Sequence, residues 1–86
     1  MIFFVYIIYN KKHNKFYIGQ THDLSKRLKE HNSGLSKYTS KHDGDWELKY
    51  KEELESRSSA FRREKFLKKQ KNKNFYWKTI KDYNSK

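Results

Sequence analysis

The chain has 86 residues with no cysteine and no proline, and its 21 lysines and arginines outnumber 10 aspartates and glutamates, for a net charge of +11. This length allows a single domain, residues 1–86, with a small core, and without cysteine no disulfide can form. A structural zinc site would need His, Asp or Glu ligands alone, and the four histidines show no paired ligand spacing, so we expect none. The charge favours a polyanion partner: DNA, RNA or an anionic membrane.

An apolar run at residues 2–9 predicts a first strand that is buried on both faces. The run is far shorter than a membrane span and lacks the flanking features of a signal peptide, so we expect a cytoplasmic protein that does not enter a membrane. Polar residues 10–14 predict a turn, and residues 15–19 predict a second strand. Two strands joined by about five polar residues predict an antiparallel hairpin.

The next element is a helix predicted over residues 24–32. Thr21 and Asp23 offer oxygens that can cap its first turn, and Gly34 is a plausible stop signal. Residues 35–45 are polar and predict a loop.

A strict alternation of apolar and charged residues over 46–51 predicts a half-buried third strand. Ser56 can cap a long helix over residues 57–71, and a last helix is predicted over 74–83. The order is strand, strand, helix, strand, helix, helix. This order predicts an α+β domain, with a small three-stranded sheet flanked by helices.

The first predicted helix places two cationic or titratable groups beside its apolar stripe. On a helical wheel, Leu24 and Leu28 mark the buried side, and Arg27 and His31 fall on that same side. A charged group there needs a partner, because burying it unpaired is costly. Arg27 either extends along the edge of the core to pair with an acidic side chain or serves a functional site.

The second predicted helix has a carboxylate near the middle of its apolar face. Ala60, Phe61 and Leu67 define that face, and Glu64 sits among them. A carboxylate in this position is either part of a structural ion pair or a ligand of a divalent cation. Magnesium takes oxygen ligands and keeps several waters, so one carboxylate with phosphate oxygens can suffice.

Two tyrosines of the predicted hairpin can lie close across the strand pair. Tyr6 is on the first strand and Tyr17 is on the second. They are either ordinary core residues or, if Arg27 and Glu64 converge on the same place, candidates for acid–base chemistry.

The positive charge is concentrated near the C-terminus. Residues 62–86 carry ten basic and two acidic residues, net +8, against net +3 for residues 1–61. Aromatic residues lie among these lysines, and they either pack against the core or form a surface that stacks on bases. The residues expected to contact nucleic acid are Lys26, Arg62, Arg63, Lys65, Lys68, Lys69 and Lys71.

Two short motifs and two helical segments occur in a familiar order. Phe4-Val5-Tyr6 and Tyr17-Ile18-Gly19 are separated by ten residues, residues 20–31 contain Arg27, and residues 60–65 contain Glu64. Together they resemble the GIY-YIG endonuclease superfamily over essentially the whole chain. The resemblance is greatest to small stand-alone bacterial GIY-YIG proteins, and it extends to the nuclease domains of homing endonucleases and of the excision-repair incision subunit.

The resemblance implies a role for each matching residue. Tyr6 and Tyr17 match the two motif tyrosines, and one of them, Tyr17 by preference, would activate the attacking water. Gly19 would allow a tight backbone turn beside the site. Arg27 would bind the scissile phosphate, and His31 would assist proton transfer or phosphate contact. The metal ligand would be Glu64, holding a single Mg²⁺ or Mn²⁺.

Two departures from the family pattern qualify the expected activity. Phe4 replaces the first glycine of the family name, without touching a catalytic atom. Gln20 stands where the repair nucleases have a lysine, which predicts slower cleavage or the use of another cation.

The resemblance therefore implies a metal-dependent DNA endonuclease that selects structure, such as branched or nicked DNA, or selects sequence weakly, in DNA repair or recombination. No obligatory protein partner is evident. Two alternatives remain: a non-catalytic nucleic-acid-binding module with the same fold, and a basic RNA- or ribosome-associated protein.

Overall fold

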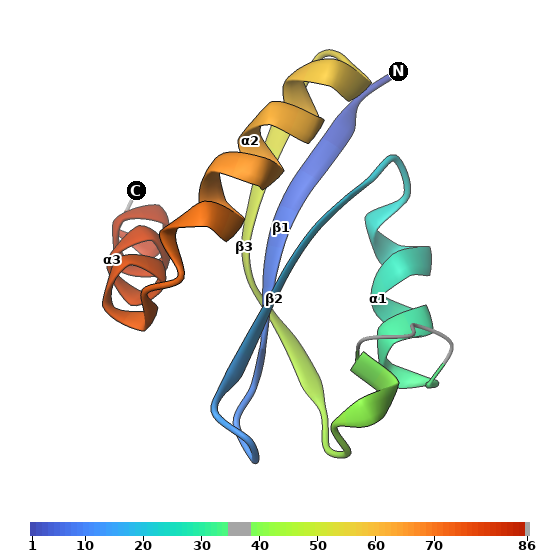
Figure 1. The fold of residues 1–86 in the computed structure, drawn as a ribbon. Coiled ribbons are helices and arrows are strands. Elements are labelled where there is room, and N and C mark those ends of the chain that lie inside the picture. Colours follow the sequence, from blue (N-terminus) through green and yellow to red (C-terminus); the bar gives the residue numbers. More distant parts are fainter. Residues whose placement is uncertain (35–38, 86) are drawn as a thin grey trace.

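The computed structural model describes residues 1–34 and 39–85. In chain order the elements are β1 (Phe3–Asn10), β2 (Lys15–Thr21), α1 (Leu24–Asn32), the short 3₁₀ helix η1 (Thr39–Lys41), β3 (Trp46–Leu54), α2 (Arg57–Gln70) and α3 (Lys73–Asn84) (Figure 1). The predicted α+β class and the order of strands and helices are confirmed.

The sheet has three strands in the order β2-β1-β3, and both strand pairs are antiparallel. In Figure 1, α1 lies on one side of the sheet, and α2 and α3 lie on the other side. The central strand β1 is therefore covered on both faces, as its continuous apolar run predicts. β2 is an edge strand, and α2 packs against it.

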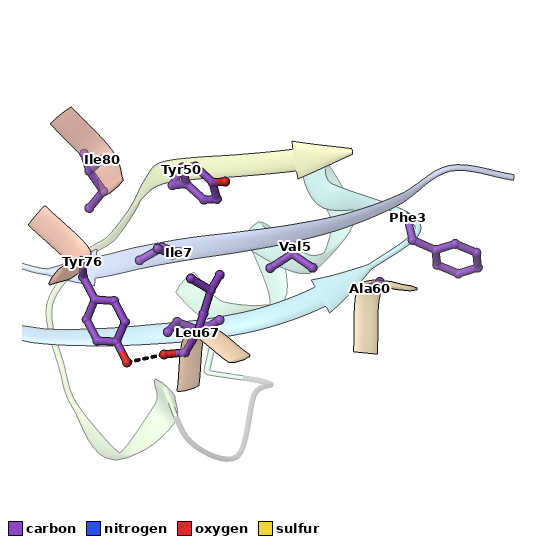
Figure 2. Packing of buried hydrophobic residues seen from close by; sticks show 9 residues of the cluster. Phe3, Val5, Ile7, Tyr50, Ala60, Leu67, Tyr76 and Ile80 are labelled. Carbon is purple, nitrogen blue, oxygen red and sulfur yellow. Dashed lines mark hydrogen bonds between the residues drawn. The ribbon is translucent and has the colours of Figure 1, made fainter. Parts of the chain in front are cut away.

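The two faces of the sheet support separate clusters of buried side chains. The larger cluster lies under α2 and α3 and includes Val5, Ile7 and Leu67 (Figure 2). The smaller one lies under α1 and is built on Tyr6 and Ile8, which alternate with the first two along β1. In the described part of the chain, no helix is long and apolar enough to cross a membrane.

The third strand exists as predicted, but the prediction that only one of its faces is buried is wrong. Ile7 pairs with Tyr50 and Ile8 pairs with Leu48, so Lys49 is an extra residue that forms a β-bulge. The bulge switches the side-chain alternation, so that Trp46 joins the cluster under α1 while Tyr50 joins the cluster under α2 and α3. Leu48 is left 37% exposed.

Short polar side chains fix the helix ends. Asp23 accepts a hydrogen bond from the Lys26 N–H at 3.1 Å, and Ser56 accepts one from the Ser59 N–H at 3.1 Å, as predicted. Gly34 follows the end of α1 with a φ of +79°, a left-handed conformation that favours glycine. The loop predicted at 35–45 contains η1, and its residues 35–38 lie outside the described residues.

Candidate active site

The absence of a side chain at Gly19 leaves the space that the end of the Tyr6 ring occupies. The two residues are paired across β1 and β2. A Cβ on Gly19 would collide with the Tyr6 hydroxyl at 2.5 Å and would make a tight contact of 3.0 Å with Cε2 of Tyr17. The tight backbone turn expected at Gly19 is wrong, because Gly19 lies within the continuous strand β2. The site needs a glycine there for space.

Tyr6, His31 and Thr39 form a chain of hydrogen bonds beneath α1. The Tyr6 hydroxyl lies 2.8 Å from Nε2 of His31, and Nδ1 of His31 lies 2.9 Å from Oγ1 of Thr39. The Thr39 hydroxyl donates to the backbone carbonyl of His31 at 3.4 Å, so its oxygen accepts from Nδ1–H. Nε2 then carries no proton, and the Tyr6 hydroxyl donates to it.

Burial keeps both rings of this pair neutral. His31 is 2% exposed and Tyr6 is 1% exposed. Burial, with the nearby positive charge of Arg27, lowers the pKa of His31 to about 4. Burial and the neighbouring Tyr17 phenol raise the pKa of Tyr6 above its usual value, and attraction to Arg27 only partly opposes the rise. Tyr6 therefore holds its proton, and His31 acts as an acceptor that orients the Tyr6 ring.

Tyr17 lies beside this pair but is only half-buried. Its ring centroid is 4.8 Å from that of His31 and 6.3 Å from that of Tyr6. On its other side, Nζ of Lys68 lies 5.8 Å from the ring centroid. Cations within about 6 Å of an aromatic ring are attracted to its face. Tyr17 therefore occupies the boundary between the buried tyrosine–histidine pair and solvent.

Arg27 connects both tyrosines to α1. Burial alone would lower the pKa of Arg27, but hydrogen bonding to Glu30, Tyr6 and Tyr17 outweighs burial and raises it. The guanidinium also forms an ion pair with Glu30, with 3.1 Å between Nη1 and Oε1. The acidic partner that the sequence left open is thus present, three residues along the same helix. The Arg27 side chain as a whole remains 32% exposed, so it is not sealed inside the protein.

Glu64 approaches the site from the opposite side of the sheet. It lies between Ala60 and Leu67, the two buried residues of α2, and its side chain is 16% exposed. Its Oε2 is 2.5 Å from Nζ of Lys68, and its charge contributes to the raised pKa of Tyr6. Because β2 is an edge strand, no further strand screens Tyr6 from the charge of Glu64 on that side.

The predicted apolar face of α2 is wrong at one residue. Phe61 is 56% exposed, while Ala60 and Leu67 are fully buried. At 100° per residue, the line that faces the sheet runs through positions 60, 64 and 67, and position 61 is rotated away from it. Glu64, rather than Phe61, is on the face of α2 that meets the sheet.

The donor set around Glu64 suits one hard divalent cation. The ammonium group of the half-exposed Lys68 side chain lies on the carboxylate, so a metal ion that bound there would have to displace it. Among the described residues no three His, Asp or Glu side chains converge, so other ligands would have to be water and phosphate oxygens.

The rings of His13 and His42 lie 5.4 Å apart, a proximity that their sequence spacing did not predict.

The predicted nucleic-acid contacts fall into three groups. Lys68 and Lys71 line a cavity together with Tyr17, so they adjoin the site. Arg63 does not: its Nε forms a 3.0 Å ion pair with Glu52 on β3, the opposite edge of the sheet. The exposed cations that lie elsewhere on α1 and α2 are Lys26, Arg62, Lys65 and Lys69.

The aromatic residues of the basic C-terminal region follow mainly the packing alternative. Tyr76 is 7% exposed and belongs to the core under α3, whereas Trp77 is 39% exposed.

Two residues that contact the site were not predicted from the sequence. Thr39 comes from the predicted loop, where its sequence gave no signal, and Glu30 could have been found by its i,i+3 spacing from Arg27.

Comparison with known proteins places these features in a family. Residues 2–83 match the GIY-YIG catalytic domain. A similar solved structure is the solution NMR structure of the UPF0213 protein BH0048 from Bacillus halodurans, with 31% sequence identity and a TM-score of 0.55 over 90% of this chain and 81% of that one. No curated protein shows a significant match. The chain belongs to the GIY-YIG catalytic domain family, a nuclease-type domain whose substrates are nucleic acids.

Proposed function

We propose that this protein is a metal-dependent DNA endonuclease that hydrolyses phosphodiester bonds at the site formed by Tyr17, Arg27 and Glu64. One observation carries the proposal. Nζ of Lys68 lies 2.5 Å from Oε2 of Glu64 and 5.8 Å from the ring centroid of Tyr17, which puts Glu64 near Tyr17. Interaction with both motif tyrosines also raises the pKa of Arg27. Phosphoryl hydrolysis needs a cation, a base and a metal ligand around one point, and these residue types meet that need.

Arg27 binds and orients the scissile phosphate. Its ion pair with Glu30 fixes the guanidinium on α1, and its partly exposed face can donate to phosphate oxygens. Positive charge aimed at the phosphate stabilises the negative charge that develops in the transition state. Glu64 would hold one Mg²⁺ or Mn²⁺, which would supply further charge neutralisation of the phosphate and stabilise the departing oxygen.

Tyr17 is the better candidate for the general base. Tyr6 is buried, donates a hydrogen bond to His31 and has a raised pKa, so it stays protonated and cannot take a proton from water. Tyr17 is half-buried and lies between Arg27 and Lys68, two cations that can balance a phenolate during proton transfer. Tyr6 and His31 then act as positioning residues that hold the Tyr17 ring in place.

The substrate we propose is DNA with little sequence preference, including branched or nicked forms met in repair and recombination. The cations beside the site contact backbone phosphates, which carry no sequence information. The cleavage test is incubation with supercoiled plasmid and with branched DNA in Mg²⁺, in Mn²⁺ and in EDTA. Cleavage that requires the metal supports the proposal, and no cleavage of any DNA form with either metal would contradict it.

A non-catalytic nucleic-acid-binding module is the second candidate. Two ion pairs favour it, because Arg27 pairs with Glu30 and Glu64 pairs with Lys68, which are the structural roles that these residues would have in an inactive domain. Under this alternative, the protein binds DNA or RNA with the same salt dependence but cuts neither with either metal.

A further inference from the structure

A cavity adjoins the proposed active site on the outer edge of β2. It has a volume of about 450 Å³ and is lined by Phe16, Tyr17, Ile18, Lys68, Lys71 and Tyr76. This volume falls within the range of about 300–1,000 Å³ that ligand pockets commonly have. Tyr17 is the residue that it shares with the site, so the occupant of the cavity would be next to the scissile phosphate.

The aromatic walls of the cavity are held in fixed positions. The Tyr76 hydroxyl donates to the carbonyl of Leu67 at 2.8 Å (Figure 2). It also accepts from the Lys71 N–H at 3.2 Å. Phe16 is packed edge-on against Tyr76 and Trp77, with ring centroids 5.4 and 5.0 Å away. Rings that are already ordered lose little conformational freedom when a flat ligand stacks on them.

The charges at the cavity suit a nucleotide rather than an apolar ligand. Lys68 and Lys71 are both exposed at its rim, and Lys68 faces the ring of Tyr17. Aromatic rings beside lysines form the combination that binds single-stranded nucleic acid, because bases stack on the rings while the cations contact phosphates. A base inside an intact duplex is stacked on its neighbours and cannot enter such a cavity.

We infer that this cavity binds one unpaired nucleobase adjacent to the scissile phosphate, so that the preferred substrate is DNA with an unpaired nucleotide at the cleavage point. The inference rests on the proposed function, which it deepens by naming the structural feature that is selected. Phe16 and Tyr17 provide the aromatic surface for the base, with the largely buried Tyr76 ring behind Phe16, and Lys68 and Lys71 bind the flanking phosphates.

Binding in EDTA tests this inference without any cleavage. The probes are a duplex with one bulged thymidine and the same duplex with an abasic residue at the bulge. The parent protein should bind the thymidine probe roughly 5- to 150-fold more tightly, the range that stacking of one base on an aromatic ring provides. Equal affinity for the two probes would overturn the inference. Either result leaves the cleavage experiment unaffected.

Two further measurements locate the base. Phe16→Leu should remove most of the preference for the thymidine probe, whereas Lys69→Ala, a matched control on the exposed surface of α2, should weaken both probes equally and keep their ratio. A 5-iodouracil at the bulge should photo-crosslink the parent protein at Phe16, Tyr17 or Tyr76, which keeps the test valid even if Phe16→Leu fails to fold. A crosslink confined to the exposed Phe61 or Phe66 would contradict the inference.

Discussion

The Tyr6 hydroxyl donates to Nε2 of His31 across 2.8 Å, and this bond lies beneath a helix with both partners almost fully buried. The pair explains why the second motif ends in glycine, because the Tyr6 ring occupies the space that any side chain at Gly19 would need. It also assigns different tasks to the two motif tyrosines. Tyr6 is fixed in the interior, and Tyr17 is left facing the substrate side.

Replacing Gly19 with alanine should disturb the site through this contact. The new Cβ would lie 2.5 Å from the Tyr6 hydroxyl, and the buried ring has little room to move. We expect a loss of about 1–3 kcal/mol in the free energy of unfolding, typical of overpacking. Urea unfolding measures it, with Gly34→Asn as a control that removes a glycine with open space around it. A Gly19→Ala protein as stable as the parent would contradict the packing described for Tyr6.

The protein should lose stability in mildly acidic solution because of His31. Burial lowers the pKa of His31 from 6.5 to about 4, so between these values the unfolded chain binds a proton that the folded chain does not. The free energy of unfolding should therefore fall as the pH drops from about 6.5 to about 4, by up to roughly 3 kcal/mol. NMR titration of the His31 ring checks the pKa directly.

The two tyrosines should respond differently to loss of their hydroxyl groups. Tyr6→Phe leaves Nε2 of the buried His31 without its donor, which should destabilise the fold by about 1–3 kcal/mol. Tyr17→Phe acts on a side chain that is only half-buried, so it should change stability less than Tyr6→Phe does and abolish most cleavage. Thermal unfolding and cleavage rates of the two variants test this division. A Tyr17→Phe protein with parental cleavage would assign the base to another group.

Local sequence patterns were sufficient to predict most of the fold. These elements depend on residues that are close together in the sequence. Examples are the apolar run of β1, the polar turn at 10–14, and the capping residues Asp23 and Ser56. The bulge at Lys49 could not be predicted, because it depends on how β3 pairs with β1. A strict alternation in sequence contains no sign that the strand will switch faces halfway.

Only part of the site could be predicted in the same way. Arg27 and His31 share one helical face, so their proximity follows from helix geometry alone. The contact between His31 and Thr39 depends on the path of a loop, and the influence of Glu64 on Tyr6 depends on α2 packing beside the edge strand. The space above Gly19 follows from strand register, which the sequence of β2 alone does not specify.

DNA binding should depend on salt through the exposed lysines and not through every basic residue. Each phosphate neutralised on duplex DNA contributes a slope of about −0.9 to the dependence of log affinity on log salt. Lys69→Ala, at an exposed position on α2, should make that slope less steep by about this amount. Arg63→Gln should leave the slope unchanged, because the Arg63 side chain is paired with Glu52. Fluorescence anisotropy at several salt concentrations distinguishes the two, and equal effects of both variants would contradict the assignment.

The most direct test of the proposed endonuclease is the single-turnover cleavage rate of Glu64→Ala at saturating DNA and Mn²⁺. This variant removes the proposed metal ligand and leaves Tyr17 and Arg27 in place. Helical content and DNA affinity, measured on the same sample, confirm that the fold and the binding surface remain. The account predicts a cleavage rate at least about 100-fold below that of the parent, the scale of losing one electrostatic contribution to the transition state. A Glu64→Ala protein that cuts as fast as the parent would contradict it.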